Sequence, residues 1–171
     1  PAEKGMVFHS DPEKNLAEKI YGISGEFFKN LGEGVDTEFS GNEKRFREKY
    51  GINSPFMLYA GRKEAGKNVD QLVQFFVEYK RKNSSELKLV LIGGGQIELP
   101  SKEIIDLGFV PSQDKYDAYA AASVFCNPSR MESFSLVIME SWLLRRPVLV
   151  NCECDVTTDF VRKANGGLYY G

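Results

Sequence analysis

Two glutamates enclose a mostly apolar insert in the segment ESFSLVIME, which covers residues 132–140. On one continuous helix Glu132 and Glu140 would lie about 12 Å apart and about 80° away from a common face, since a helix rises about 1.5 Å per residue. Two carboxylates that act on a single bond, as in a retaining glycosidase, are separated by about 5 Å. The spacing therefore excludes a pair that shares one bond cleavage, and the two acids must serve separate purposes.

The residues between the two glutamates predict a turn followed by a helix. A serine-rich turn leads into an expected helix over about residues 135–145, which leaves the backbone N–H groups of Phe134, Ser135 and Leu136 near its N-terminus. Free N–H groups and the helix dipole favour an anion at that position. The segment therefore predicts an anion site with one acid before the helix and one within it.

Two interpretations of the glutamates are open at this point. Ionised carboxylates repel phosphate but accept strong hydrogen bonds from hydroxyl groups. A nucleotide sugar has a hexose at one end, a ribose at the other end and a diphosphate between them, which matches the order of Glu132, the N–H groups and Glu140. In the alternative interpretation, Glu132 caps the helix and Glu140 forms an ion pair with Arg145 or Arg146. The spacing alone does not separate the two.

A second candidate anion site follows the apolar run FMLYA at residues 56–60. The next loop, GRKEAGKN, begins with Gly61, which lets the backbone approach a ligand closely. It also supplies two cations, Arg62 and Lys67, beside an expected helix N-terminus, and such an arrangement can bind a diphosphate. The alternative is a basic loop that is simply solvated.

A glycine run at residues 93–95 follows the next apolar segment. It carries no dinucleotide-binding fingerprint, because GxGxxG needs a third glycine and this chain has Ile97 and Glu98 in the stretch where that glycine would fall. The glycines instead predict a tight turn close to a ligand.

Hydrophobic periodicity predicts strands that alternate with helices. Apolar runs bounded by turn residues predict strands at residues 56–60, 87–95, 107–110, 123–129, 146–151 and 166–170. Helical periodicity and capping residues predict helices at 10–22, 67–82, 114–122, 135–145 and 156–164, with a further charged helix within 32–51. The alternation predicts an α/β fold with a parallel sheet covered by helices on both faces. Ligands of such sheets bind at the carboxyl ends of the strands, here after Ala60, Ile92, Val110, Cys126 and Val150.

The composition excludes several classes of protein. A chain of 171 residues with 42% hydrophobic residues suffices for one folded domain with a core. Its 22 basic and 24 acidic residues give a net charge of −2, which argues against general binding to nucleic acid or an anionic membrane. No apolar stretch reaches the length of a membrane span. Three cysteines, with Cys-Glu-Cys at 152–154 but no second cluster, predict reduced thiols, no metal site and a cytoplasmic location.

Several of these motifs together resemble glycosyltransferase family 4, a family of retaining GT-B enzymes with an E-x7-E motif. The resemblance rests on the GR…GK loop, on PSRMESFSLVIME followed by PVLVN, and on GVDTEF at residues 34–39, which is similar to the stretch where that family's chain enters its second domain. It implies a Rossmann-like, C-terminal GT-B domain that binds a nucleotide-sugar donor over residues 32–171. Residues 1–31 would then be an interdomain or leading segment, and the N-terminal acceptor domain would be absent from this chain.

The resemblance implies roles for the charged residues at the strand ends. Arg62 and Lys67 would neutralise the donor diphosphate, and stabilising this departing group is where the catalytic gain would arise. Glu132 would contact hydroxyls of the transferred hexose, and Glu140 would contact hydroxyls of the ribose. Arg62, Lys67 and Glu132 would form the catalytic set. The donor would be a UDP-sugar or a GDP-sugar, and no divalent metal or other cofactor is expected because arginine and lysine take the metal's role in this family.

The resemblance also implies backbone contacts with the donor. The N–H groups of Phe134, Ser135 and Leu136 would help to hold the phosphates, while Gly94 and Val110 would lie near the base. These assignments place the donor along the carboxyl edge of the expected sheet.

The sequence departs from the family pattern at several positions. The family often has glycine where this chain has Ser133 or Ser135, and it often has Gly-Gly-x-x-Glu where this chain has CECDVTTDFV after the strand at 147–150. The single histidine, His9, does not stand in the context of the catalytic histidine that the family's N-terminal domain supplies. We therefore expect an excised donor-binding domain that is inactive alone.

The sequence thus predicts the donor domain of a hexosyltransferase that moves a hexose from a nucleotide-diphosphate sugar to an acceptor hydroxyl. Its expected partners are the nucleotide sugar and the missing acceptor domain, with no nucleic acid and no membrane span. The parent enzyme could still dock on a membrane surface. The competing hypotheses are a GT-B-like sugar-nucleotide epimerase, a phosphorylase, for which no lysine stands in a Schiff-base context, and a non-catalytic nucleotide-binding module.

Overall fold

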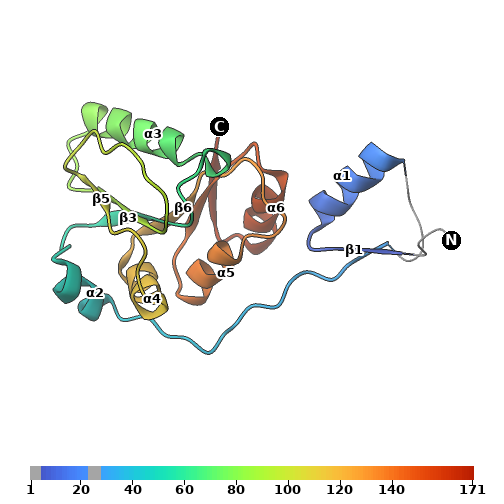
Figure 1. The fold of residues 1–171 in the computed structure, drawn as a ribbon, viewed down its shortest axis with the longest axis horizontal. Coiled ribbons are helices and arrows are strands. Elements are labelled where there is room, and N and C mark those ends of the chain that lie inside the picture. Colours follow the sequence, from blue (N-terminus) through green and yellow to red (C-terminus); the bar gives the residue numbers. More distant parts are fainter. Residues whose placement is uncertain (1–4, 23–27) are drawn as a thin grey trace.

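The structure, a computed structural model, describes residues 5–22 and 28–171 and is built around one parallel sheet (Figure 1). The sheet has six strands in the order β5-β4-β3-β6-β7-β8, and all neighbouring pairs are parallel. The strands are β3 (Phe56–Ala60), β4 (Lys88–Ile92), β5 (Ile104–Asp106), β6 (Val124–Asn127), β7 (Val148–Asn151) and β8 (Gly167–Tyr170). This arrangement confirms the predicted α/β fold.

Helices cover both faces of the sheet, as the handedness of parallel crossovers requires. The helices are α2 (Glu43–Tyr50), which precedes β3, and the 3-10 turn η1 (Ala65–Lys67), α3 (Val69–Lys82), α4 (Ser112–Ala121), α5 (Leu136–Leu143) and α6 (Asp155–Ala164), which lie in the connections between strands. The chain moves one way from β3 through α3 to β4, and the other way from β5 through β6 and β7 to β8. Because such crossovers are right-handed, α3 lies on one face and α4, α5 and α6 lie on the other (Figure 1).

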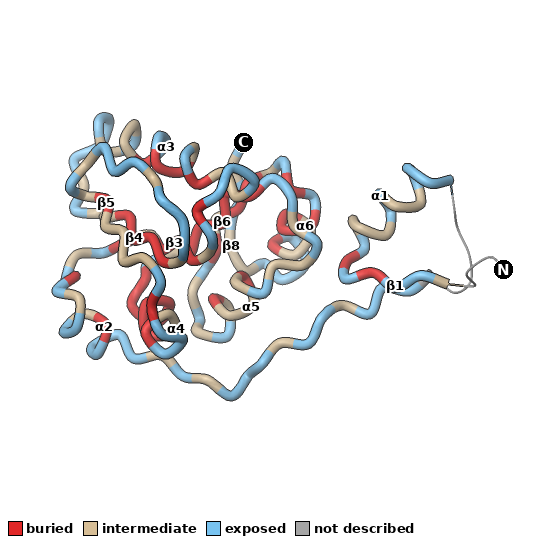
Figure 2. Tube along the Cα trace, in the orientation of Figure 1, coloured by how far each residue is buried: buried red, intermediate tan, exposed pale blue. Residues whose placement is uncertain are grey.

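Two apolar clusters hold these layers together. The larger one packs α2, α4, α5 and α6 against the sheet and includes Phe46, Leu58, Tyr119, Phe125 and Ile138. The smaller one packs α3 against the opposite face. Figure 2 shows the buried positions concentrated in the strands and in α4, which accounts for the continuous apolar runs that predicted the strands.

Most of the predicted elements lie within two residues of their expected ends, but the strand expected at 107–110 is wrong. The strand is β5, three residues earlier, because Gly108 adopts a left-handed φ of 63° and turns the chain out of the sheet. The strand expected within 87–95 ends at Ile92, where the glycine turn was expected, and Gly93 has φ 124°. The helix expected from residue 67 begins at Val69, after Asn68 in a left-handed conformation.

The N-terminal part of the chain forms a smaller unit that the sequence did not fully predict. Strands β1 (Met6–Phe8) and β2 (Phe28–Asn30) pair in parallel and were not predicted, whereas helix α1 (Asp11–Tyr21) confirms the helix expected at 10–22. An ion pair of 2.9 Å between Lys163 Nζ and Asp11 Oδ2 joins α1 to α6. The predicted division of the chain at residues 31 and 32 stays a prediction.

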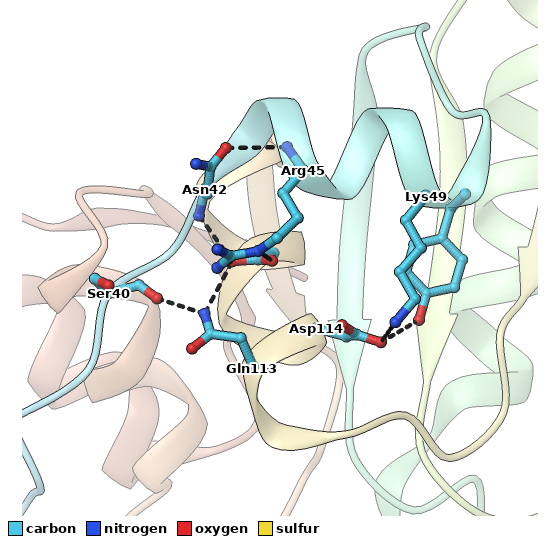
Figure 3. Close-up of polar contacts among 8 residues, drawn as sticks. Ser40, Asn42, Arg45, Lys49, Gln113 and Asp114 are labelled. Carbon is cyan, nitrogen blue, oxygen red and sulfur yellow. Dashed lines mark hydrogen bonds and ion pairs between the residues drawn. The ribbon is translucent and has the colours of Figure 1, made fainter.

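An extended segment, residues 31–42, connects this unit to α2 and passes beside α4 (Figures 1 and 2). It is fixed at its end by Asp117, whose side chain is 1% exposed. Asp117 Oδ1 accepts hydrogen bonds from Asn42 N at 2.8 Å, Arg45 Nη2 at 2.6 Å and Gln113 Nε2 at 3.0 Å (Figure 3). Gln113 also donates to Ser40 O at 2.8 Å, so α4 holds both the segment and α2.

A second carboxylate on α4 strengthens the same contact. Asp114 Oδ2 accepts hydrogen bonds from Lys49 Nζ at 2.7 Å and from Tyr50 Oη at 2.6 Å (Figure 3). The bonds from Lys49 and Tyr50 hold the pKa of Asp114 below its usual value. Burial acts to raise the pKa of Asp117, but the hydrogen bonds from Arg45 and its neighbours outweigh this effect and lower it.

Removing the Asp117 carboxylate should destabilise the fold. We expect Asp117→Ala to lower the free energy of unfolding by about 3 kcal/mol, because it leaves several donors between α2 and α4 without their acceptor. Urea unfolding measures the change. Glu78→Ala, which breaks an exposed ion pair with Arg81 on α3, serves as the control and should leave the midpoint unchanged. An equally small effect of both substitutions would contradict the assignment.

The two lowered pKa values also predict how stability depends on pH. Near the usual pKa of about 3.9 the unfolded state binds more protons than the folded state, so stability rises with pH in this range. The contribution of Asp114 and Asp117 is complete above this range and is lost as the pH falls through their lowered folded values. In urea unfolding, the doubly substituted variant Asp114→Asn, Asp117→Asn should lose less stability than the wild-type chain between about pH 6 and pH 3. Parallel pH profiles would contradict this prediction.

Candidate functional site

The candidate site is a cavity of about 260 Å³ at the carboxyl edge of the sheet. It lies between the ends of β3 and β6, the 3-10 turn η1 and the N-terminus of α5. Six of the residues singled out in the sequence line it: Gly61, Lys67, Glu132, Phe134, Ser135 and Leu136. The remaining lining residues are Glu33, Tyr59, Ala60, Asn127, Ser133 and Val137.

An ion pair between Lys67 and Glu132 forms the charged centre of this cavity. Lys67 Nζ lies 2.9 Å from Glu132 Oε1 and 3.0 Å from Oε2, although 65 positions separate the two residues in the sequence. Lys67 is at the end of η1, and Glu132 is in the loop between β6 and α5. The interpretation of Glu132 as a helix cap is therefore wrong, because the N-cap of α5 is Ser135 and the Glu132 carboxylate faces a lysine instead.

The N-terminus of α5 provides backbone N–H groups on the same cavity. Ser135 has a left-handed φ of 83°, and no side chain caps the helix. The first-turn donors next to Leu136 therefore face the cavity without a side-chain acceptor, which suits an anionic or oxygen-rich ligand. This arrangement agrees with the N–H cluster expected from the sequence.

Asn127, at the end of β6, holds the loop that carries Glu132. Its side-chain amide donates to Ser135 Oγ at 2.9 Å and its Oδ1 accepts from Ser129 N at 3.1 Å. Ser129 Oγ in turn donates to Met131 O at 3.0 Å. No motif in the sequence singles out Asn127. The signal that could have found it is a buried polar residue at the carboxyl end of a predicted strand, where ligands of parallel sheets bind.

Arg62 does not reach the cavity. Its side chain is 75% exposed and its Nη2 lies 3.2 Å from Glu64 Oε1. Its neighbour Lys63, which was not among the predicted site residues, is buried instead and lies 3.1 Å from Asp106 Oδ1, with a further bond to Gly93 O. Lys63 thus ties the loop after β3 to the ends of β4 and β5.

The glycine turn after β4 lies against the same loop. Lys63 N donates to Gly94 O at 2.7 Å, and a Cβ on Gly93 would lie 2.0 Å from Gly61 O. This close approach explains the need for glycine here. Gly94 is exposed and does not line the cavity, and the side chain of Val110 is buried in the larger apolar cluster.

Glu140 lies within α5 and outside the lining of the cavity. Its Oε1 lies 2.6 Å from Lys115 Nζ on α4. The ion pair expected with Arg145 or Arg146 is therefore wrong, because α5 ends at Leu143 and the chain turns, after which Arg146 Nη2 donates to the backbone of α4 at Ala120.

A larger cavity of about 540 Å³ adjoins the first and shares Lys67, Glu132 and Ser133 with it. Its far wall comes from α1 and from an ion pair of 2.7 Å between Arg130 and Glu153. The Lys67–Glu132 pair therefore lies where the two cavities meet, so a ligand with two chemically different halves can contact it from both sides.

The cysteines form no cluster that resembles a metal centre. Within residues 5–22 and 28–171, no group of three or more His, Cys, Asp or Glu side chains is arranged to hold a metal ion. All three cysteines are free, and burial raises the pKa of the Cys126 thiol to about 12. None of the helices in the described part of the chain is both long and apolar enough to cross a membrane.

Together, the parallel sheet and the charged cavity at its carboxyl edge define an α/β domain with a candidate ligand site. Comparison with known proteins gives the family. Residues 54–170 match the family described as "Glycosyl transferases group 1", and the chain belongs to this family. It is 24% identical over 127 residues to an alpha-D-kanosaminyltransferase of Streptomyces kanamyceticus, an alignment that covers 68% of this chain and 33% of that protein.

Solved glycosyltransferase structures share the fold. The glycosyltransferase WaaG, which is involved in lipopolysaccharide biosynthesis, superposes with a TM-score of 0.76 at 22% identity and covers 95% of this chain and 48% of its own. Anabaena Alr3699/HepE in complex with UDP and glucose superposes with a TM-score of 0.78 at 17% identity and covers 98% and 49%. The fold is thus GT-B-like. The chain spans about half the length of these structures and a third of the curated relative.

Ser135 gives a direct test of the backbone geometry at the site. A left-handed φ costs a side chain with a Cβ about 1 kcal/mol relative to glycine, so Ser135→Ala should be less stable than Ser135→Gly by about that amount. Thermal or urea unfolding of both variants measures the difference. The matched control is Ser133, which is not among the residues with positive φ, and there alanine should be at least as stable as glycine. The same order at both positions would contradict the geometry.

Proposed function

We propose that this chain is the donor-binding domain of a retaining glycosyltransferase of family 4 that moves a hexose from a nucleotide-diphosphate sugar to an acceptor hydroxyl. The observation that carries the proposal is the Lys67–Glu132 pair beside the N-terminus of α5, in a cavity at the carboxyl edge of the sheet. The solved relative HepE, in complex with UDP-glucose, supports a ligand of this class. Under this proposal the acceptor is bound by a further domain of the parent enzyme.

The charges of the site suit both halves of such a donor. Lys67 and the first-turn N–H groups of α5 are placed to balance the diphosphate, whose negative charge grows as the bond to the sugar breaks. Glu132 is placed to accept hydrogen bonds from sugar hydroxyls. Arg62 lies on the same loop as Lys67, and its exposed side chain is free to turn toward a bound diphosphate. Because these cations and N–H groups are already present, we propose that donor binding needs no divalent metal.

The donor changes the partner of Lys67 when it binds. Lys67 and Glu132 neutralise each other, and both are only partly exposed. A diphosphate that takes over the Lys67 ammonium leaves the Glu132 carboxylate free to accept hydroxyl groups. Binding of the phosphates and binding of the sugar are therefore coupled through one ion pair.

Calorimetric titration of the 171-residue chain tests the proposal. The ligands are UDP, GDP and ADP, each bare and as the glucose conjugate, in buffer with EDTA. We expect one base to be preferred and the conjugate to bind more tightly than the bare nucleotide. No binding of any of the six ligands would contradict the proposed function. Equal binding of nucleotide and conjugate would favour a non-catalytic nucleotide-binding module.

Substitutions in the charged pair should separate the two halves of the donor. Glu132→Ala should weaken the sugar nucleotide by about tenfold, the cost of one hydrogen bond to a charged group, while leaving the bare nucleotide unchanged or tighter because Lys67 is released. Arg62→Ala should weaken both ligands alike. The same titrations measure these effects, with Glu64→Ala, the exposed partner of Arg62, as control. Equal losses of both ligands for Glu132→Ala would contradict its role toward the sugar.

A further inference from the structure

A glutamate from outside the main sheet lines the candidate cavity. Glu33 lies in the extended segment that leaves the N-terminal unit, three residues after β2 (Figure 1). It lines the same cavity of about 260 Å³ as Lys67 and Glu132, although it was not among the predicted site residues. Its side chain is exposed, and within residues 5–22 and 28–171 no hydrogen bond or ion pair holds its carboxylate. The Glu33 carboxylate can therefore turn toward a ligand in this cavity without losing another partner.

The backbone just before Glu33 is fixed to the N-terminal unit. Leu31 N donates to Phe8 O at 3.0 Å, which continues the pairing of β2 with β1. Gly32 N donates to Asn30 Oδ1 at 3.0 Å, and Gly32 has a left-handed φ of 67° that turns the chain after the strand. Backbone contacts thus place Glu33 at the cavity, and its side chain plays no part in holding the segment.

The charges around the cavity leave Glu33 unbalanced. Among the lining residues that the structure describes, Lys67 is the single cation, and it pairs with Glu132 at 2.9 Å. Tyr59 also lines the cavity but is neutral, because burial raises its pKa above the usual value and the nearby Glu132 carboxylate adds to the effect. At neutral pH the side chains of the cavity therefore carry one net negative charge, which is that of Glu33.

A bound donor makes this imbalance larger. Under the proposed function the diphosphate takes over the Lys67 ammonium and the N–H groups of α5. Glu132 and Glu33 then both face the rest of the ligand, with no side-chain cation of the cavity left between them. Two carboxylates that share a site are stabilised by a nearby cation and destabilised by a further anion. The charge of the group next to the diphosphate should therefore affect binding.

We propose that Glu33 selects the donor by the charge of its sugar, so that a hexose with a free amino group binds best and an acidic hexose binds worst. This inference rests on the proposed function, since it takes the ligand to be a nucleotide sugar. An ammonium group supplies the cation that the two carboxylates lack and donates hydrogen bonds to them. A neutral sugar offers hydroxyl donors only. A carboxylate on the sugar adds a further negative charge beside Glu33 and Glu132.

Calorimetric titration with a charge series of sugars tests the proposal. The ligands share the base that the wild-type chain prefers and carry glucosamine, glucose or glucuronic acid. At about pH 6 an amine with a pKa near 8, the usual value for an α-amino group, is protonated while carboxylates are ionised. We expect the affinity to fall in the order glucosamine, glucose, glucuronic acid. The differences should shrink as salt is added, because Glu33 is exposed.

Glu33→Gln removes the charge and keeps the shape of the side chain. It should weaken the glucosamine conjugate by about threefold and strengthen the glucuronic acid conjugate by about threefold, the effect of one exposed charge pair. The ratio of the two affinities should therefore fall by about tenfold, while the glucose conjugate changes little. Glu33→Asp keeps the charge and should keep the order of the three sugars.

Glu38→Gln is the matched control. Glu38 is an exposed glutamate of the same extended segment, but it does not line the cavity. The substitution changes the net charge of the chain by the same amount as Glu33→Gln. It should leave the ratio of glucosamine to glucuronic acid affinity unchanged, because its charge is screened from the ligand by solvent.

The outcomes separate this inference from the proposed function. If the wild-type chain binds nucleotide sugars but Glu33→Gln changes the affinity ratio no more than Glu38→Gln does, the inference is overturned and the proposed function stands. A wild-type chain that binds the glucuronic acid conjugate as tightly as the glucosamine conjugate also overturns the inference alone. If the chain binds no nucleotide sugar with any of the three bases, both the proposed function and the inference are overturned.

Discussion

All six strands of the central sheet run in the same direction, and the position of the site follows from this constraint. Because parallel strands are joined by crossovers that return the chain to the opposite edge, all strands end at the same edge of the sheet. The loops after β3, β4, β5 and β6 therefore meet there. The close contact between Gly93 and Gly61 and the bond from Lys63 to Asp106 join three of these loops. The cavity lies at this edge, where the loops after β3 and β6 meet the N-terminus of α5.

The two glutamates of the E-x7-E segment share one electrostatic arrangement. Each is paired with a lysine from another element: Glu132 with Lys67 at the end of η1, and Glu140 with Lys115 on α4. Helix α5 therefore has a neutralised carboxylate before its N-terminus and another within it, and the first-turn N–H groups between them keep their partial positive charge. This pattern allows a ligand with a negative centre and hydroxyl-bearing ends to bind without like charges facing each other.

The sequence predicted the sheet well because its strands are buried on both faces and read as continuous apolar runs. It misplaced the strand near residue 107, since IID at 104–106 ends in a polar residue and the apolar stretch LGFV at 107–110 encloses the turn at Gly108. The short, mostly exposed β1 has no periodicity that would identify it. The start of α5 could be predicted because its turn signals are local, whereas the roles of the residues around it stay predictions.

Side-chain partners that are distant in sequence were beyond prediction. Lys67 and Glu132 are 65 residues apart, and Lys115 and Glu140 are 25 residues apart, so only the folded topology brings them together. The difference between exposed Arg62 and buried Lys63 has a similar origin. Neighbouring side chains of an extended loop point in opposite directions, and which of them turns inward depends on the position of Asp106 in another strand.

The pairing of acids with lysines also bears on how a donor is distinguished from a free nucleotide. A cation that is already neutralised attracts a diphosphate less strongly than a free one, because the incoming anion must displace the carboxylate that holds it. At Lys67 this displacement releases Glu132, whose gain of new hydrogen bonds depends on a hydroxyl-bearing group lying beside the phosphates. A bare nucleotide pays the cost of separating the pair but leaves the released carboxylate to water. Under the proposed function, a nucleotide sugar would recover that cost, so the ion pair would favour the complete donor over the bare nucleotide.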